Sequence, residues 1–294
     1  MEQYLDLLSH VIQNGTRKEN RTGVDTISTF GYFYEHDFDD GFPLLTTKKM
    51  PWKSIVVELL WFLSGSNDIA FLHRHGVNFW DPWINSDGTV NSPYNSAWRR
   101  FETPNGNIDQ IQWAIDKLKS KPMSRDIVVS AWQPHIAHNP PSETVYWNPC
   151  HTMFVLNVQN VCKEQRLCLQ LLQRSADSFV GAPFNLASYA LLNCIFAKIV
   201  GMKPGIFAHS IVDAHLYTCK EDGTMDDYDH VPLALEQIKR RPLLLPRIVI
   251  DNSIKSLDDV VALLNPNVTT EEILSKFKLV NYKYHPPIKA KVAV

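Results

Sequence analysis

The chain has 294 residues, of which 45% are hydrophobic, and its 29 basic and 31 acidic side chains leave a net charge of −2. This composition is typical of a packed globular protein and excludes disordered, collagen-like and coiled-coil chains. Because there is no basic field for a nucleic-acid backbone and no run of about 18 apolar residues to span a bilayer, we expect a small-molecule partner and neither nucleic acid nor membrane.

From the N-terminus onward, the periodicity predicts a mixture of helices and strands. Residues 2–13 carry apolar side chains at helical spacing, and residues 53–63 predict a longer apolar helix in which Glu58 is the single acid. Short apolar runs, partly β-branched, predict strands at 127–132, 152–158, 167–172 and 247–250. Residues 185–200 are long and apolar enough for a buried helix, whereas 251–275 is typical of surface loop and short helix.

These elements show no regular βαβ alternation, and no repeat, low-complexity tract or interdomain linker divides them. We therefore expect a single domain over residues 1–294. Its fold class is α+β, with a mixed sheet that helices cover on one face. The other face of the sheet would remain exposed to solvent, so we expect a second subunit to cover it.

The N-terminal residues lack a cationic stretch followed by an apolar core, so we expect no secretory signal and a cytoplasmic protein. The five cysteines are irregularly spaced and contain no CxxC pair, which argues against a disulfide framework and against a zinc site, so no metal is expected. Four of them are interpreted as small buried hydrophobes: Cys162, Cys168, Cys194 and Cys219.

Cys150 differs because it stands in NPCH, between a proline-rich loop and a predicted strand, beside His151. A thiol at a strand entrance is an exposed nucleophile when a nearby cation lowers its pKa. Downstream, Arg174 and Ser175 follow a strand, and an arginine fork with a hydroxyl is suited to a phosphate. An ordinary surface salt bridge explains the arginine equally well.

Polar side chains continue in QRSADSFVGAPFNLASY (173–189), where Asp177, Gly181 and Asn185 lie in a turn that opens a helix. The Asn185 amide offers one acceptor and two donors, which match the C4 carbonyl and N3–H of a uracil. Cytosine, with its reversed edge, would prefer an Asp. Taken alone, an Asn at a helix start is typically a cap.

The block DAHLY (213–217) places His215 and Tyr217 two residues apart, on the same side of an extended segment. Two polar side chains projected together are able to bind a sugar hydroxyl. A half-exposed strand end explains them almost as well, so both interpretations stay open at this point.

Taken together, these segments resemble the thymidylate synthase and pyrimidine hydroxymethylase superfamily over nearly the whole chain. Nine blocks occur in the family's order, which leaves little room for chance. They are NRTG (20–23), DGFPLLTTKK (40–49), ELLWFL (58–63), WDPW (80–83), SRDIVVSAW (124–132), PCH (149–151), QRSADSFVGAPFNLASYALL (173–192), DAHLY (213–217) and YHPPIKAKVAV (284–294).

The resemblance implies a thymidylate synthase-like fold and a role for each matching residue. Cys150 is similar to the nucleophile that adds to C6 of the pyrimidine, and Glu58 to the carboxylate that organises water for proton transfers. The implied catalytic set is completed by Arg174, Tyr94, His151 and Asp177. The implied ligands of the substrate are Arg21, Arg174, Ser175, Gln173, Asn185, His215 and Tyr217, with Arg125 donated by the second subunit of an obligate homodimer. The implied folate wall contains Trp80, Trp83 and Asp177, with Val294 in the closing tail.

The chain departs from the family pattern in several places. Where thymidylate synthases carry a segment like GPVYGxQWR, this chain has NSPYNSAWR (91–99), which is more similar to the phage deoxycytidylate hydroxymethylases. Asp126 replaces a second arginine near the expected phosphate site. The remaining departures are Ile211 and Val212 in place of two glycines, Thr218 and Cys219 in place of an Asn-His pair, and Trp147 in place of a smaller aliphatic residue.

These departures bear on one step of the family's reaction. After the one-carbon unit of methylenetetrahydrofolate has reached C5, the exocyclic methylene is quenched by hydride, which gives methyl, or by water, which gives hydroxymethyl. An altered folate wall favours water. With Asn185 in its uracil form, the resemblance implies a deoxyuridylate hydroxymethylase acting on dUMP. The alternatives are an atypical thymidylate synthase, a cytidylate-specific hydroxymethylase and a non-catalytic nucleotide-binding homologue.

Overall fold

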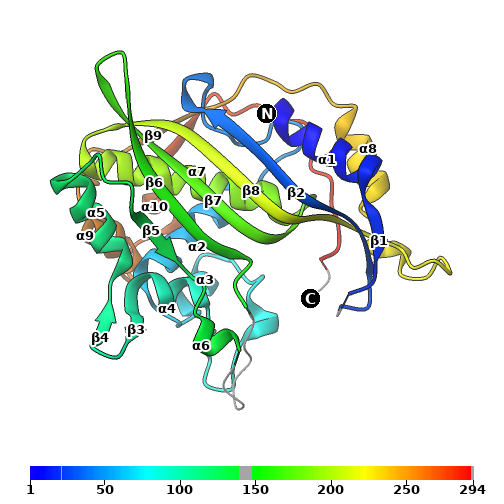
Figure 1. The fold of residues 1–294 in the computed structure, drawn as a ribbon, viewed down its shortest axis with the longest axis horizontal. Coiled ribbons are helices and arrows are strands. Elements are labelled where there is room, and N and C mark those ends of the chain that lie inside the picture. Colours follow the sequence, from blue (N-terminus) through cyan, green and yellow to red (C-terminus); the bar gives the residue numbers. More distant parts are fainter. Residues whose placement is uncertain (21, 139–147, 293–294) are drawn as a thin grey trace.

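The computed structural model describes residues 1–20, 22–138 and 148–292 (Figure 1). Its strands are β1 (Thr16–Lys18), β2 (Asp25–Asp37), β3 (Phe101–Thr103), β4 (Gly106–Ile108), β5 (Ile127–Ser130), β6 (His151–Val161), β7 (Glu164–Asp177), β8 (Lys203–Thr218), β9 (Arg247–Ile250) and β10 (Phe277–Val280). Its α-helices are α1 (Glu2–Asn14), α2 (Trp52–Ser64), α3 (Ala70–Arg74), α4 (Pro93–Arg100), α5 (Gln110–Ser120), α6 (Pro134–Ala137), α7 (Gly181–Val200), α8 (Val231–Ile238), α9 (Leu257–Val261) and α10 (Thr270–Lys276).

The main sheet has six strands in the order β1-β2-β8-β7-β6-β5. Neighbours are antiparallel except β7 and β8, which run parallel and are joined by the crossover helix α7. Helix α7 is apolar on every side, and α2 buries nine consecutive residues from Ile55 to Leu63. Both helices therefore lie in the core, on the same side of the sheet (Figure 1).

The sequence predictions for the fold class and the main elements are confirmed. The helix predicted at 53–63 is α2, and the strand predicted at 247–250 is β9. The helix predicted at 185–200 begins four residues earlier, at Gly181, so Asn185 lies inside its first turns and is not a cap. Residues 251–275 contain the short helices α9 and α10, each opened by a capping box.

Within the described residues one helix, α7, is long and apolar enough to cross a membrane, contrary to the sequence expectation that no such run exists. Most of it is buried, and its buried residues belong to the hydrophobic core. A core helix covered on all sides has this composition for the same reason as a membrane span, because no side of it meets water. We therefore interpret α7 as a core helix.

The sheet face opposite α2 and α7 exposes apolar side chains. Phe33, Val128 and Val212 are 56%, 37% and 46% exposed, and each adjoins a buried residue whose side chain points toward the helices. Strand alternation therefore places these three side chains on the open face. An open apolar face of this kind is what the sequence analysis expected a second subunit to cover.

Candidate active site

Cys150 lies immediately before β6, where a β-bulge interrupts pairing with β7 between His151 and Met153. Arg174 of β7 holds this corner: its Nε donates to the carbonyl of Pro149 at 2.9 Å and its Nη2 to that of Asn148 at 2.7 Å. The same Nη2 lies 3.7 Å from the sulfur of Cys150. A fixed guanidinium beside a thiol favours the thiolate, which is the reactive form.

Tyr94 also holds the backbone at the start of β6. Its hydroxyl accepts hydrogen bonds from the backbone N–H of Cys150 at 3.1 Å and of His151 at 3.3 Å. The Tyr94 ring stacks on the imidazole of His151, with centroids 4.7 Å apart. Burial lowers the pKa of His151 to about 4, and its interaction with the Asn185 side chain opposes this only in part, so the ring is neutral at neutral pH.

Glu58 is the acid that stood out in the apolar helix, and it is only 6% exposed. The indole N–H of Trp80 donates to its Oε1 at 2.8 Å. Burial raises the pKa of Glu58 to about 8, against the opposing effect of that hydrogen bond. The charges of both Cys150 and Glu58 add to the rise in the pKa of Tyr94 that burial causes, which places Tyr94 within electrostatic range of both.

Asn185 faces the site from α7 and is held by Gln173 of β7. The amide nitrogen of Gln173 donates to Oδ1 of Asn185 at 3.1 Å and to the carbonyl of Ser175 at 3.0 Å. Since Oδ1 is turned toward Gln173, the Nδ2 donors of Asn185 point the other way. The amide then offers Nδ2 as a donor and the second lone pair of Oδ1 as an acceptor, which are the groups that a uracil edge requires.

His215 and Tyr217 lie together on β8, as the spacing of DAHLY predicted, with their rings edge to face at 5.5 Å. Nδ1 of His215 lies 3.0 Å from Asp213, whose carboxylate also accepts from Ser28 at 3.0 Å and from Lys18 at 2.5 Å. Burial raises the pKa of Asp213, but His215, Lys18 and Ser28 together lower it by more, so the pKa is below its usual value. The resulting carboxylate fixes the orientation of the His215 ring.

The comparison with known families shows which family the chain belongs to. The model of the thymidylate synthase family matches residues 2–294. The chain belongs to the thymidylate synthase family. It is therefore a one-carbon transferase that acts on a pyrimidine nucleoside monophosphate, with methylenetetrahydrofolate as co-substrate. Members of this family methylate or hydroxymethylate C5 of dUMP.

The folate wall expected from the resemblance contains a suitable aromatic surface. Trp80 and Trp83 are edge to face at 5.6 Å; Trp80 is 8% exposed, whereas Trp83 is half-buried. Trp83 is thus the more accessible ring for a flat heterocycle, and Trp80 backs it while holding Glu58. These residues fit the co-substrate of a thymidylate synthase.

Asp177 is linked to the C-terminal segment through His230. It accepts from the backbone N–H of Phe179 at 2.9 Å and lies 3.6 Å from Nδ1 of His230. Burial raises its pKa, but His230, His215 and the N–H of Phe179 together lower it by more, so the carboxylate form prevails. The opposite nitrogen of His230 contacts the carbonyl of Lys291 at 2.7 Å, which ties the tail beside the site.

The sequence analysis missed two residues near Asp177. One is His230, which is fully buried before α8. The other is Lys48, whose ammonium donates to the carbonyl of Phe179 at 2.5 Å and lies 3.7 Å above that ring. Burial lowers the pKa of Lys48 to about 7. Lys48 stands in one of the nine family blocks, which was the available signal, whereas His230 stands in none.

Three residues used in the sequence analysis lie outside the described residues: Arg21, Trp147 and Val294. Arg125 is exposed, just before β5, and the next strand residue, Ile127, pairs with Leu156. Leu156 lies six positions along β6 from Cys150, and the antiparallel register puts Arg125 two residues further away. At about 3.3 Å per residue, the backbone of Arg125 is therefore more than about 20 Å from that of its own Cys150. Arg125 is therefore not brought into the site of its own chain.

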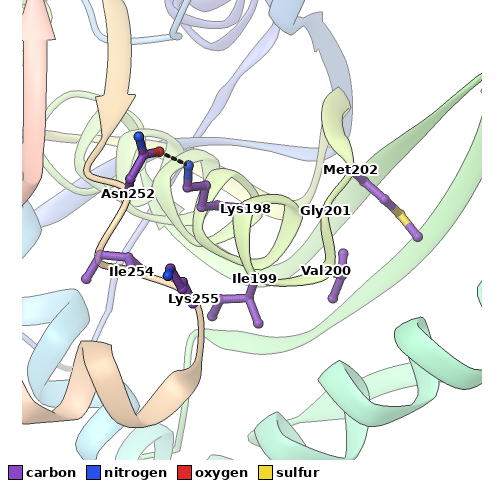
Figure 2. A pocket seen from close by; sticks show the side chains of 8 residues that line it. All are labelled: Lys198, Ile199, Val200, Gly201, Met202, Asn252, Ile254 and Lys255. Atoms are coloured by element: carbon purple, nitrogen blue, oxygen red, sulfur yellow. Dashed lines mark hydrogen bonds between the residues drawn. The ribbon is translucent and has the colours of Figure 1, made fainter.

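Asp126, which replaces the family's second arginine, points into solvent and binds Lys117 at 2.6 Å. The hydrogen bonds of Lys117 and Ser124 lower its pKa to about 2. Among residues 1–20, 22–138 and 148–292, no group of three His, Cys, Asp or Glu is arranged to hold a metal ion. A pocket at the end of α7, lined by Lys198, Gly201 and Asn252 among others, contains none of the predicted site residues (Figure 2).

The raised pKa of Glu58 predicts a pH-dependent stability. Between about pH 4.5 and pH 8 the folded protein keeps a proton that the unfolded chain releases, so stability falls as the pH rises through this window. Glu58→Gln keeps an acceptor for Trp80 and removes the titration. Its stability relative to the parent should therefore rise by up to about 4 kcal/mol from pH 5 to pH 8.

Urea unfolding of both proteins at the two pH values measures this difference. Glu102→Gln, an exposed glutamate replaced in the same way, is the matched control and should show no such trend. Parallel stability curves for the parent and Glu58→Gln would contradict the raised pKa.

Proposed function

We propose that the chain is a deoxyuridylate hydroxymethylase, which converts dUMP, methylenetetrahydrofolate and water into 5-hydroxymethyl-dUMP and tetrahydrofolate. The observation that carries the proposal is the segment around Tyr94. Ser92 caps α4, and Asn95 is fully buried with its amide donating to the carbonyls of Trp61 and Ser66 at 2.8 Å and 2.6 Å. Asn91 and Asn95 thus stand where synthases carry glycines, and Ala97 stands where they carry glutamine.

The residues of the site have the properties that this reaction needs. The Cys150 thiolate adds to C6, which makes C5 a carbon nucleophile that takes the one-carbon unit from the co-substrate. Loss of the C5 proton and departure of tetrahydrofolate then leave the exocyclic methylene on C5. Glu58, with its pKa of about 8, is able to take up and release protons near neutral pH through ordered solvent. In the last step it removes a proton from the water that adds to the exocyclic methylene, and Cys150 then leaves C6.

The same proposal assigns the substrate ligands. Arg174 and Ser175, with Arg21, bind the phosphate, Asn185 held by Gln173 reads the uracil edge, and His215 with Tyr217 binds the ribose hydroxyl. The supporting geometry is the guanidinium fixed at Cys150, the orientation of Asn185 and the paired rings on β8. His151, neutral and stacked on Tyr94, positions this ring beside the nucleophile.

A thymidylate synthase that produces dTMP and dihydrofolate is the second candidate. It is favoured by Trp80, which is packed as part of an intact wall, and by the tail fastened through His230. A tail that seals the site excludes water, which protects a hydride transfer.

Product analysis separates the two candidates. A hydroxymethylase should give 5-hydroxymethyl-dUMP by mass spectrometry with no rise in dihydrofolate absorbance, because the co-substrate donates carbon but no hydride. Glu58→Gln should reduce the hydroxylation more than the release of tritium from C5, since other bases are able to serve the latter. Stoichiometric dihydrofolate with dTMP as product would establish the synthase instead.

We further propose that the protein is one domain, cytoplasmic, and a homodimer whose open sheet faces pack together, with Arg125 of each subunit reaching the phosphate in the other. The exposed Phe33, Val128 and Val212 and the separation of Arg125 from its own Cys150 support this arrangement.

The dimer should persist at micromolar concentration when its mass is measured in solution. Mixing inactive Arg125→Ala with inactive Cys150→Ser subunits should restore part of the activity, because one site of each heterodimer keeps both residues. A fully active monomer would disprove the shared site, and so would mixtures that remain inactive although heterodimers form.

A further inference from the structure

A chain of buried hydrogen bonds runs from β2 through β8 and β7 to the base-reading side chain on α7. Tyr34 and His209 face each other across β2 and β8, and the Tyr34 hydroxyl lies 2.8 Å from Nδ1 of His209. Nε2 of His209 lies 2.9 Å from Oε1 of Gln173, whose amide nitrogen donates to Asn185. Tyr34, His209 and Gln173 are 5%, 0% and 3% exposed, so water does not compete for these bonds.

The direction of every bond in this chain follows from one backbone group. The carbonyl of Ser175 is able only to accept, so the group of Gln173 that faces it is the NH2 group. Oε1 of Gln173 therefore faces His209, which must donate from Nε2. Burial lowers the pKa of His209 to about 3, so its ring is neutral and carries a single proton. Nδ1 is then an acceptor, and the Tyr34 hydroxyl donates to it.

We propose that Tyr34 and His209 are positioning residues that discriminate uracil from cytosine by fixing the amide orientation of Asn185. The inference rests on the proposed reading of the base by Asn185. With Oδ1 held by Gln173, Asn185 presents Nδ2 to O4 of uracil and the second lone pair of Oδ1 to N3–H. Cytosine requires the amide to rotate, which would bring Nδ2 of Asn185 against the NH2 group of Gln173, donor against donor.

Removing the Tyr34 hydroxyl should weaken this discrimination. In Tyr34→Phe, Nδ1 of His209 loses its donor, so the tautomer with the proton on Nε2 loses its advantage and the amides of Gln173 and Asn185 reverse more readily. We expect kcat/KM to fall for dUMP and to rise for dCMP, so that their ratio shifts by about threefold or more. Opposite changes for two substrates distinguish positioning from general weakening, which lowers both.

Tyr32→Phe is the matched control, because Tyr32 is on the same strand and contacts His10 and Tyr34 but makes no hydrogen bond to His209. Its dCMP-to-dUMP ratio should equal that of the parent. An unchanged ratio in Tyr34→Phe, together with a shifted ratio in Asn185→Asp, would overturn the role of Tyr34 while leaving the base reading intact. An unchanged ratio in Asn185→Asp would reject the base reading itself and the inference with it.

The tautomer of His209 provides a test that needs neither substrate nor activity. Nitrogen-15 NMR of the imidazole groups, with His209→Gln to assign the signal, should show a neutral ring protonated at Nε2 in the parent from pH 6 to pH 8. Tyr34→Phe should alter the Nδ1 signal, and Tyr32→Phe should not. A proton on Nδ1, or a charged ring, in the parent protein would overturn the proposal.

Discussion

Replacing Cys150 with serine should reduce kcat by at least about 1,000-fold, which corresponds to about 4 kcal/mol, and should leave dUMP binding largely intact. Affinity comes from contacts with the phosphate and the base, whereas the addition to C6 needs an ionised nucleophile. The guanidinium of Arg174, 3.7 Å from the sulfur, favours a thiolate but is not sufficient to ionise a serine hydroxyl.

Steady-state kinetics and calorimetric titration with dUMP measure the two halves of this prediction. Cys162→Ser is the matched control, because Cys162 is exposed in the turn between β6 and β7, contrary to its interpretation as a buried hydrophobe from the sequence. Its kcat should equal that of the parent. A Cys150→Ser enzyme that keeps more than about a tenth of kcat, a loss below about 1.4 kcal/mol, would reject the nucleophile assignment.

Replacing Asn185 with aspartate should move the substrate preference from dUMP toward dCMP. A carboxyl group is able to accept from the cytosine amino group and, when protonated, to donate to N3. Uracil would instead meet unpaired lone pairs at O4, at a cost of about 1–3 kcal/mol, or roughly 5- to 150-fold in kcat/KM. Gln173 still has an oxygen to donate to, so its position should be kept.

Competition between the two nucleotides in one reaction gives the ratio of kcat/KM directly. Asn252→Asp makes the same chemical change beside Lys198, far along α7 from the site (Figure 2), and should not change the ratio. A shift of less than about threefold in Asn185→Asp, about 0.65 kcal/mol, would show that this side chain does not read the base edge.

The sequence analysis predicted best the elements whose residues are mostly apolar and therefore buried. Helices α2 and α7 consist of apolar residues over three or more turns, and such runs have few alternatives to a core helix. Strand β2 was not predicted, because DTISTFGYFYEHD mixes polar and aromatic residues and has no clear alternation. Its partner β8 lies far away in the sequence, so its register is set by tertiary pairing.

The residues of the candidate site also divide into those that the sequence made recognisable and those that it did not. Glu58 was recognisable because a single acid in an apolar helix conflicts with its surroundings, and Cys150 because of its neighbours. Tyr34 and His209 carried no comparable signal: they are separated by 175 residues, and only the pairing of β2 with β8 brings them together. The sequence analysis also placed Asn185 in the turn that opens the helix, whereas the structure places it inside α7. The start of the helix was missed because α7 begins at Gly181 without a capping side chain.

The pairing of β2 with β8 also determines when the protein is able to fold during synthesis. About 180 residues separate the end of β2 from the end of β8, which at 5–20 residues per second is roughly 10 to 40 s of translation. During that time β2 exists with only the short β1 as a hairpin partner, and it carries Phe30 and Phe33, which remain 89% and 56% exposed even in the folded subunit. An unpaired aromatic strand is prone to join other chains, so we expect the nascent chain to be most prone to aggregation before β8 has emerged.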